Sequence, residues 1–339
     1  MAASIRDVAR EAGVSVGTVS NVLNRPERVA PATVARVTAA IEGLGFVRND
    51  AARQLRAGRS RSLGLVVLDT RNPFFMDVAH GAQSRALEDG YTVLMGGSDD
   101  SRDREVSLLE MFEEHRVAGV LISPVHTDLR QLNTLRSMGI PVVLVDRGSR
   151  DRSFPSVSVD DVEGGRIAAR HLLEGGRRRI AFVGGPRSIE QVADRFSGAS
   201  EVVAGASGAT LTEFPTTALS VLEGRRVGEE LAQLPAAHRP DAVFAANDLL
   251  ALGVLQALVM TGSLRVPEDV ALVGYDDIDF TRSAVVPITS VRQPATEIGS
   301  TAVDLVLREA DADLDALREQ VVFQPELVVR ASSAPVREG

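Results

Sequence analysis

The sequence predicts an α plus α/β protein: a small head of three helices, followed by two doubly wound α/β subdomains. Three observations support this fold class. The chain has 339 residues, which is more than one ordinary domain needs. Two short helical patterns separated by a glycine turn open the chain, and from Ser62 onward apolar runs alternate with helical patterns.

Composition excludes several classes of protein. Hydrophobic residues make up 44% of the chain and charged residues 24%, which is typical of a folded globular protein. The chain has no Cys, so disulfides, thiolate metal sites and Cys nucleophiles are excluded. The first ten residues are not followed by an apolar run, and no stretch of about 18 apolar residues occurs. We therefore expect a cytoplasmic protein.

The charge is distributed unevenly along the chain. Residues 1–61 hold ten arginines and five acidic residues, a net charge of +5, whereas the remainder carries −14. A short basic segment on an acidic protein is typical of a nucleic-acid-binding module. All 37 basic residues are Arg, in the acidic part as well, so codon bias explains the absence of Lys more simply than function does.

The first helix is predicted from Ser4, an N-cap residue with Asp7 three positions later as its capping-box partner. Gly13 ends this helix, and Ser15 begins a second one after a short turn. This spacing predicts a helix-turn-helix. The apolar faces of the two helices need a third partner, for which the stretch 31–44 offers Val34, Val37, Ile41 and Leu44 at helical spacing.

The outward residues of the second helix are small or carry amides, as residues that meet base edges in the major groove do. Asn21 is suited to a bidentate contact with adenine. The alternative is a three-helix bundle with a merely solvated polar face. The expected DNA-binding residues of the head are Ser15, Val16, Gly17, Thr18, Asn21, Asn24 and Arg28.

The segment after the head is basic, with four arginines between positions 53 and 61 and one leucine, Leu55. It is too short to be stable as an isolated helix. A linker that folds only on DNA would use Arg53 and Arg56 for phosphates and Leu55 as a wedge between base steps. The alternative is a flexible basic tether.

In the acidic part, apolar runs of strand length predict buried parallel strands connected by helices. So many strands exceed one sheet, which indicates two subdomains with a cleft between them. The predicted strands are 63–68, 92–95, 117–122, 142–145, 180–183, 242–246 and 270–273.

Ligands of such folds bind beyond the carboxyl ends of the strands. The residues there are carboxylates, amides and aromatic rings, to which Arg195 adds a guanidinium; together they suit a ligand with vicinal hydroxyls. Each residue also has a simpler interpretation as a turn residue or helix cap. The segments at these strand ends are 69–75, 123–124, 146–147, 184–186, 247–248 and 275–277.

Several segments of the head resemble one known family. The stretches 5–9, 13–15, 18–20, 23–24 and 52–55 are similar to the DNA-binding head and hinge helix of the lactose-repressor/galactose-repressor (LacI/GalR) family of bacterial transcription regulators. The resemblance implies a homodimer on palindromic double-stranded operator DNA, with two recognition helices in successive major grooves. It also implies paired hinge helices in the minor groove, where Leu55 opens a central CG step.

The remainder resembles the effector-binding core of the same regulators, itself similar to periplasmic sugar-binding proteins. The matching stretches are 72–75, 143–147, 194–198, 240–248, 274–277 and 291–294. By analogy, the resemblance implies a small carbohydrate effector, with Arg195 and Asp276 on opposite sides of its ring hydroxyls. The effector-binding residues that it implies are Asn72, Phe74, Asp146, Arg195, Asn247 and Asp276, with Ser123 and Gln293 beside them. One departure concerns Leu219 and Ser220, which stand where many members carry an aromatic residue, so a smaller or deoxygenated effector is one alternative.

The resemblance implies three parts: a helix-turn-helix domain at 1–48, a hinge helix and linker at 49–61, and an effector-binding and dimerisation core at 62–339. Within the core, we expect one subdomain at about 62–161 and 294–320 and the other at about 162–293 and 321–332.

No catalytic arrangement is found in the sequence. The five His residues lack metal-ligand spacing, and there is neither a phosphate-binding loop with Lys nor a nucleophile elbow, so we expect no enzyme, cofactor or metal. The main hypothesis is an allosteric, sugar-controlled repressor. The alternatives are a soluble sugar-binding protein and a purine-type regulator that needs a corepressor.

Overall fold

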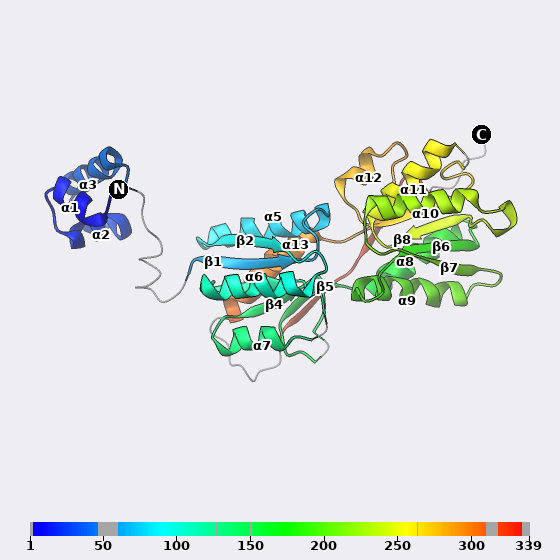
Figure 1. Ribbon diagram of the computed structural model, residues 1–339, viewed down its shortest axis with the longest axis horizontal. Helices are drawn as coiled ribbons and strands as arrows, with labels where there is room; N and C mark the ends of the chain where they lie inside the picture. The colour runs from blue at the N-terminus through cyan, green and yellow to red at the C-terminus, as the bar shows by residue number, and fades with distance from the viewer. Residues whose placement is uncertain are drawn as a thin grey trace. The chain divides into compact units, whose positions relative to one another are not determined.

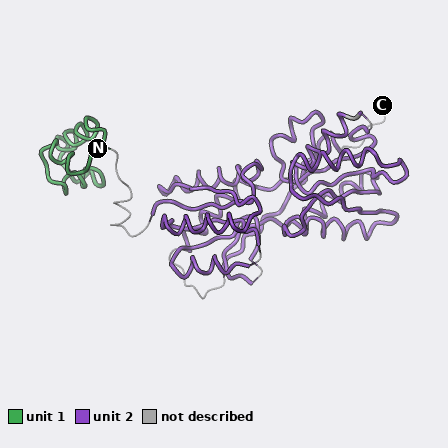
Figure 2. Tube along the Cα trace, in the orientation of Figure 1, with its two compact units in different colours: residues 1–59 green, residues 60–339 purple. Residues whose placement is uncertain are grey.

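The structure, a computed structural model, describes residues 3–46, 60–126, 128–149, 151–262, 264–309 and 318–333. The chain forms two compact units, Met1–Arg59 and Ser60–Gly339, which we call the head and the body (Figure 2). The predicted hinge segment, with Arg53, Leu55 and Arg56, lies outside the described residues.

The head begins with the predicted helix-turn-helix. Helix α1 (Ile5–Glu11) carries the predicted capping box: the Asp7 N–H donates to Ser4 Oγ at 3.4 Å, and the Ser4 N–H donates to Asp7 Oδ2 at 2.9 Å. Helix α2 (Val16–Asn24) is capped by Ser15, whose Oγ accepts from the Thr18 N–H at 3.0 Å. A 3-10 turn η1 (Pro26–Arg28) leads to helix α3 (Pro31–Leu44).

A small apolar core joins the three helices. Val8, Val19 and Val37, one from each helix, are fully buried in it. The prediction that Leu44 belongs to this core is wrong, because its side chain is 37% exposed. Gly45 adopts a left-handed conformation (φ 58°) that ends α3, and the next residue, Phe46, packs against the core.

The body contains, in its described part, two six-stranded sheets. Their order is β11-β5-β4-β3-β1-β2 in the first sheet and β12-β10-β9-β8-β6-β7 in the second. Every pairing is parallel except β10 with β12. The strands are β1 (Ser62–Val67), β2 (Thr92–Gly97), β3 (Gly119–Ile122), β4 (Val142–Val145), β5 (Ser156–Val159), β6 (Arg179–Gly184), β7 (Thr210–Pro215), β8 (Ala242–Ala245), β9 (Ala271–Asp276), β10 (Thr289–Arg292), β11 (Gln320–Phe323) and β12 (Glu326–Val328).

Helices cover both faces of each sheet, as doubly wound folds require (Figure 1). On the first sheet, Leu65 of β1 packs with α5 and α13, while its neighbour Val66 packs with α6 and α7. The helices of the body are α5 (Pro73–Glu88), α6 (Arg102–Glu114), α7 (Arg130–Ser137), α8 (Asp161–Glu174), α9 (Glu190–Ala204), α10 (Val221–Gln233), η2 (Ala236–His238), α11 (Asp248–Thr261), α12 (Asp279–Ser283) and α13 (Ala295–Glu309).

The chain passes between the two sheets three times: after β5, after β10 and after β11. The boundary that we expected between residues 320 and 321 falls inside β11, which pairs with β5 of the first sheet. The crossing there lies between Phe323 and Glu326, because β12 pairs with β10 of the second sheet.

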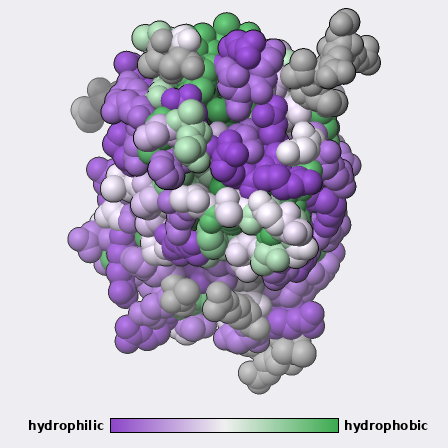
Figure 3. Space-filling model, turned by 90° about the vertical axis from the view of Figure 1, so that its right-hand side faces the viewer, coloured by the Kyte–Doolittle hydropathy of each residue, from purple (hydrophilic) through white to green (hydrophobic). Residues whose placement is uncertain are grey.

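The body also exposes large apolar side chains. Leu222 of α10 is 78% exposed, Met260 of α11 is 65% exposed and Phe280 of α12 is 58% exposed. Figure 3 shows one face of the molecule, on which hydrophobic residues form patches among hydrophilic ones. None of the helices in the described ranges is long and apolar enough to cross a membrane.

Candidate functional site

In the head, helix α2 presents its small and amide residues to solvent. Val16, Gly17 and Asn21 are exposed, and Val16 exposes 38% of its surface. Asn24 is also exposed, but its Nδ2 donates to the Ser20 carbonyl at 2.8 Å. Arg28 is exposed in η1. The first turns of α2 therefore offer an accessible surface on which neither bulky nor acidic side chains stand.

In the body, a cavity of about 260 Å³ lies beyond the carboxyl ends of strands from both sheets. Its polar wall combines carboxylates, amides and a guanidinium, and its apolar wall includes Phe74 and Leu219. Seven of the eight predicted effector-binding residues line it: Asn72, Phe74, Asp146, Arg195, Asn247, Asp276 and Gln293.

Ser123 is the exception, because it does not line this cavity. It directly follows β3 and is 1% exposed, and its Oγ has no hydrogen-bond partner among the described residues. The strand end and the family resemblance placed Ser123 among the candidates, but its side chain is enclosed by protein.

Asp276 occupies the centre of the polar wall. Its Oδ1 accepts from Gln293 Nε2 at 2.8 Å, and its Oδ2 accepts from Asn72 Nδ2 at 3.4 Å. Burial raises the pKa of Asp276 to about 6. Asn72 follows β1 of the first sheet, and Asp276 ends β9 of the second sheet. The hydrogen bond between Asn72 and Asp276 therefore joins the two halves of the body.

Arg195 of α9 is held by buried partners. Its Nε donates to Asp161 Oδ1 at 2.7 Å, its Nη1 donates to the Ala246 carbonyl at 2.8 Å, and its guanidinium lies 3.6 Å from the centre of the Tyr275 ring. Burial alone would lower the pKa of Arg195, but nearby carboxylates, Asp161 above all, raise it, so the guanidinium stays charged.

The expectation that Arg195 and Asp276 face each other across a ligand is wrong. Arg195 Nη1 lies 3.9 Å from Asp276 Oδ1, so the two residues form one wall of the cavity. Close helix packing contributes to this position: a Cβ added at Gly165 of α8 would lie 2.0 Å from the Arg195 carbonyl oxygen.

Asp146 is the second buried carboxylate of the wall. Gln191 Nε2 donates to its Oδ2 at 2.8 Å and to its carbonyl at 2.6 Å, which again links the two halves of the body. Burial raises the pKa of Asp146 well above its usual range. Its Oδ1 is buried and has no hydrogen-bond partner among the described residues.

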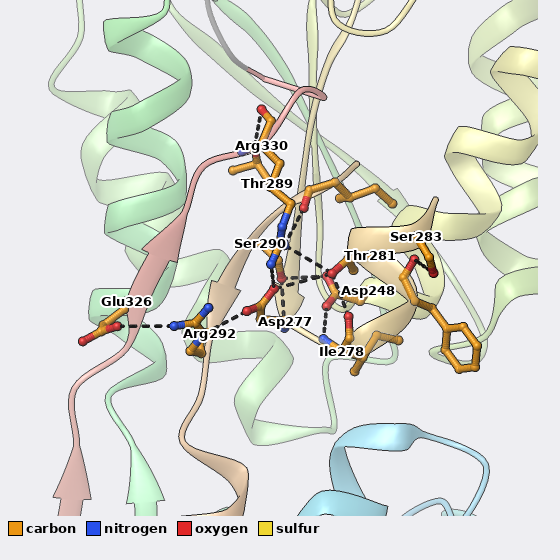
Figure 4. A network of polar contacts seen from close by, with 12 residues as sticks. Asp248, Asp277, Ile278, Thr281, Ser283, Thr289, Ser290, Arg292, Glu326 and Arg330 are labelled. Carbon is orange, nitrogen blue, oxygen red and sulfur yellow. Dashed lines mark hydrogen bonds and ion pairs between the residues drawn. The ribbon is translucent and has the colours of Figure 1, made fainter. Parts of the chain in front are cut away.

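A buried network holds the turn that carries Asp276 (Figure 4). Asp276 (φ 105°) and Asp277 (φ 56°) have left-handed backbone conformations, which are unfavourable for residues other than glycine. Asp248 Oδ2 accepts from the Ile278 N–H at 2.9 Å, and its Oδ1 accepts from Ser290 Oγ at 2.7 Å. Ser290 Oγ in turn accepts from the Asp277 N–H at 3.0 Å.

The carboxylate of Asp277 extends this network to the crossings between the sheets. It pairs with Arg292 Nε at 2.9 Å and with Arg330 Nη2 at 2.6 Å, and Arg292 Nη1 lies 3.9 Å from Glu326 Oε2 (Figure 4). The turn beside the cavity is therefore tied to two of the three crossing segments.

The simpler interpretation as helix caps holds for the two asparagines. Asn72 and Asn247 cap α5 and α11 with their Oδ1 atoms, and both also line the cavity. Asp146 precedes no helix, and the N-cap of α12 is Ile278 rather than Asp276. The two aspartates are thus not explained by helix capping.

Sequence reasoning missed Gln191 and Asp161. Gln191 lies one helical turn before Arg195, so a search of that face of α9 could have found it. Asp161 follows β5, whose sequence Ser-Val-Ser-Val is less apolar than the buried strands β3, β4 and β8. Within the described ranges, no group of His, Asp or Glu residues is arranged to hold a metal ion.

A helix-turn-helix head joined to a two-sheet body with a buried polar cavity defines a DNA-binding transcriptional regulator that responds to a small molecule. Comparison with known proteins specifies this class. Residues 4–49 match the family described as bacterial regulatory proteins, lacI family, and residues 169–333 match the periplasmic binding protein-like domain.

The chain is 33% identical over 340 residues to the HTH-type transcriptional repressor PurR of Aliivibrio fischeri (strain MJ11). This alignment covers 97% of the present chain and 98% of the relative. The chain is also 36% identical over 306 residues to the ribose operon repressor of Bacillus subtilis (strain 168), in an alignment that covers 90% and 91%. It also resembles the solved transcriptional regulator CelR–cellobiose complex, with TM-score 0.70, 31% identity, and coverage of 97% and 99%. The chain therefore belongs to the lacI family of bacterial regulatory proteins.

Proposed function

We propose that this protein is a repressor that binds operator DNA through the head and that a small carbohydrate in the body cavity controls this binding. The observation that carries the proposal is the composition of the cavity wall. Buried Asp146, Asp276, Arg195 and Asn247 surround one space of about 260 Å³ together with the apolar residue Phe74. Such a wall hydrogen-bonds hydroxyls on one side of a ring and covers C–H groups on the other.

In the head, the proposed base-reading residues are Val16, Gly17, Thr18, Asn21 and Asn24, with Ser15 and Arg28 beside them. Their support is the exposure of α2 and its capped first turn, which holds a recognition helix at a fixed orientation. In the linker, the roles proposed for Arg53, Leu55 and Arg56 rest on the sequence, as do the three parts at 1–48, 49–61 and 62–339.

In the body, we assign effector binding to Asn72, Phe74, Asp146, Arg195, Asn247, Asp276 and Gln293. Ser123 does not line the cavity, so we propose only an indirect role for it in effector binding. The named relatives support a sugar: one is a ribose operon repressor, and the solved neighbour is a cellobiose complex. The small cavity and Leu219 in its wall favour a small sugar, because a leucine offers no flat ring for stacking.

The alternative is a purine corepressor, which the similarity to the repressor PurR brings into consideration. A purine is a flat ring that aromatic side chains hold by stacking. The aromatic residues of the cavity wall are Phe74 and Phe75, whose rings contact each other edge to face at 5.1 Å. The larger share of carboxylates and amides in the wall favours the carbohydrate.

We further propose that the protein is a cytoplasmic homodimer without enzymatic activity. A two-fold axis matches a palindromic operator, and the apolar side chains exposed on α10, α11 and α12 provide surface for a second copy. We propose the cytoplasm as the protein's location because the proposed partner, operator DNA, lies there in a bacterial cell. The relatives named above are repressors, which supports the absence of a catalytic role.

Operator binding tests the first half of the proposal. In fluorescence anisotropy with DNA from the protein's own promoter region, Asn21→Ala should weaken specific binding roughly tenfold to hundredfold, by about 1–3 kcal/mol. Thr38→Ala, an exposed change on α3, is the matched control and should bind like wild type. Equal affinity of both variants for operator would contradict the assignment of α2.

Effector control tests the second half. Sugars, nucleosides and purines are added to the preformed protein–operator complex, and release is followed by anisotropy. We expect a monosaccharide to release the operator and to raise the melting temperature of the protein alone, because it binds the native body. A purine that instead strengthens operator binding would establish the alternative.

A further inference from the structure

The cavity wall carries an excess of negative charge. Five carboxylates line it, from Asp69, Asp99, Asp100, Asp146 and Asp276, against two guanidinium groups, from Arg71 and Arg195. Asp99 and Asp100 are exposed residues of the wall, whereas Asp146 and Asp276 are buried.

Both arginines already serve carboxylates of the protein. Arg71 makes a two-point contact with Asp69, with Nε–Oδ1 at 2.8 Å and Nη2–Oδ2 at 3.2 Å. Arg195 pairs with Asp161 at 2.7 Å and lies 3.9 Å from Asp276. An anionic group on a ligand would have to compete with these carboxylates for either cation.

Helix N-termini, which bind phosphate groups in many proteins, are also partly occupied around this cavity. The Phe74 N–H of α5 donates to Asn72 Oδ1, and the Leu250 N–H of α11 donates to Asn247 Oδ1. The Glu223 N–H of α10 donates to Ser220 Oγ. At each of these three helices, a side chain that lines the cavity thus satisfies one of the backbone donors that a phosphate would use.

Two buried side-chain atoms of the wall lack a hydrogen-bond partner among the described residues, and both are acceptors. They are Asp146 Oδ1 and Gln293 Oε1. A buried acceptor without a donor is unfavourable, so a ligand that brings hydroxyl or amino hydrogens to these two atoms gains affinity. A phosphate or carboxylate brings none.

We propose that the cavity selects an uncharged or cationic ligand rich in hydrogen-bond donors, such as a free sugar or amino sugar, and rejects phosphorylated and carboxylated ligands. This inference rests on the proposed function of the cavity as the effector site. It specifies the class of effector: sugars before phosphorylation or oxidation to acids.

The titration behaviour of the wall agrees with this selection. Burial raises the pKa of Asp146 and Asp276, and partial desolvation together with the carboxylates of Asp69 and Asp99 raises the pKa of Asp100, which means that negative charge is already disfavoured at these positions. A further anion in the same space is disfavoured for the same reason.

The test is isothermal titration calorimetry of the full-length protein at pH 7.5 with matched ligands. The panel contains D-ribose and D-ribose 5-phosphate; D-glucose, D-glucosamine, D-glucuronate and D-glucose 6-phosphate; and adenosine with its 5′-monophosphate. We expect the tightest ligand to be neutral or cationic, and its anionic counterpart to bind about 100-fold more weakly. An anionic ligand that binds tightest overturns the inference and leaves the proposed carbohydrate function intact.

The other outcomes separate the two proposals. If adenosine is the tightest ligand and its monophosphate is rejected, the charge selection stands and the carbohydrate assignment falls. If no compound of the panel binds, both proposals are overturned.

Two variants connect the selection to named carboxylates. Asp276→Asn should reduce the ratio of neutral to anionic affinity by about tenfold, and Asp100→Asn, at the exposed part of the wall, by about threefold. Asp103→Asn is the matched control, because Asp103 is an exposed residue of α6 that does not line the cavity. Equal ratios in all three variants overturn the inference, and Asp100→Asn decides alone if Asp276→Asn does not fold.

Discussion

In the head, the residues proposed to read DNA lie within fourteen positions of the chain, from Ser15 to Arg28, and most of them are exposed. In the body, the residues proposed to bind the effector extend from Asn72 to Gln293, and all seven in the cavity wall are buried. The head carries its site on the surface of one capped helix. The site of the body consists of buried residues at the ends of strands and on helices, and these come from both halves of the body.

This difference has an energetic consequence. An exposed side chain can be replaced with little effect on folding, because it makes few contacts in the native state. A buried ion pair or hydrogen-bond network loses far more when one member is removed, because the remaining members stay buried without partners. We therefore expect the effector site to be coupled to the stability of the body, and the DNA-reading surface to be almost independent of the stability of the head.

The largest effect is expected for Arg195→Met. This change leaves the buried carboxylates of Asp161 and Asp276 without their cation, so the free energy of unfolding should fall by about 3–5 kcal/mol. Urea denaturation at pH 7 measures the loss. The control is Arg71→Met, since Arg71 lines the same cavity with 78% of its side chain exposed and should change stability by less than about 1 kcal/mol. Similar losses in both variants would contradict the contrast between buried and exposed positions.

The second effect concerns pH. Burial raises the pKa of Asp276 to about 6, above the value of about 3.9 for an aspartate in an unfolded chain, so between about pH 4 and 6 the folded protein binds a proton there that the unfolded chain releases. The protonated residue therefore contributes stability that is complete below about pH 4 and is lost as pH rises through 6. Relative to Asp276→Asn, wild type should lose roughly 3 kcal/mol over this window. A difference between the two proteins that stays constant from pH 4 to 7 would show that Asp276 titrates normally.

The third effect concerns the network that holds the Asp276 turn. Ser290→Ala removes the donor to Asp248 Oδ1 and the acceptor of the Asp277 N–H, so the free energy of unfolding should fall by about 1–3 kcal/mol. Ser283 is exposed, and its Oγ donates only a long hydrogen bond to the Phe280 carbonyl at 3.4 Å. Ser283→Ala is therefore the control and should be nearly neutral in the same denaturation experiment.

The smallest effect is expected in the head. Ser15→Ala removes the N-cap of α2 and should cost about 1 kcal/mol of local stability. Hydrogen exchange of the amides from Val16 to Asn24 in the full-length protein measures this opening, which should increase about fivefold. Ser15→Asp keeps a capping oxygen and should restore protection. Unchanged exchange in the alanine variant would mean that the cap does not limit the opening of α2.

The sequence and the structure agree most closely where local chemistry decides. The capping box of Ser4 and Asp7, the cap at Ser15 and the helix-turn-helix spacing depend on residues three or four positions apart. The central strands of both sheets were predicted as well, because they are uninterrupted apolar runs. The family resemblance supplied the eight candidate effector-binding residues, and seven of them line one cavity.

Local reasoning failed where a residue's environment comes from far along the chain. Leu44 has the correct helical spacing for the core, but Gly45 ends the helix and Phe46 packs there instead. Ser123 follows a strand as the other candidates do, yet protein encloses its side chain. The pairing of Arg195 with Asp161 joins residues 34 positions apart on two packed helices, which no local pattern reveals.

Two of the five described strands that were not predicted show the same limit. β5 and β10 are buried but contain Ser and Thr, which are unfavourable in a core unless they are hydrogen-bonded. Their partners are distant: Ser156 Oγ donates to Gln320 Oε1 at 2.6 Å across 164 positions, and Ser290 Oγ donates to Asp248 Oδ1 at 2.7 Å across 42.

The sequence by itself thus determined the head, the central strands, the family and the residue types of the site, because short-range spacing and apolar patterning encode them. Only the tertiary structure decided which polar residues are buried together, which arginine neutralises which carboxylate, and which acceptors remain for a ligand. The physical reason is that a buried polar group is stable only beside its partner, and in the body of this protein many of the partners lie 34 to 204 positions apart in the chain.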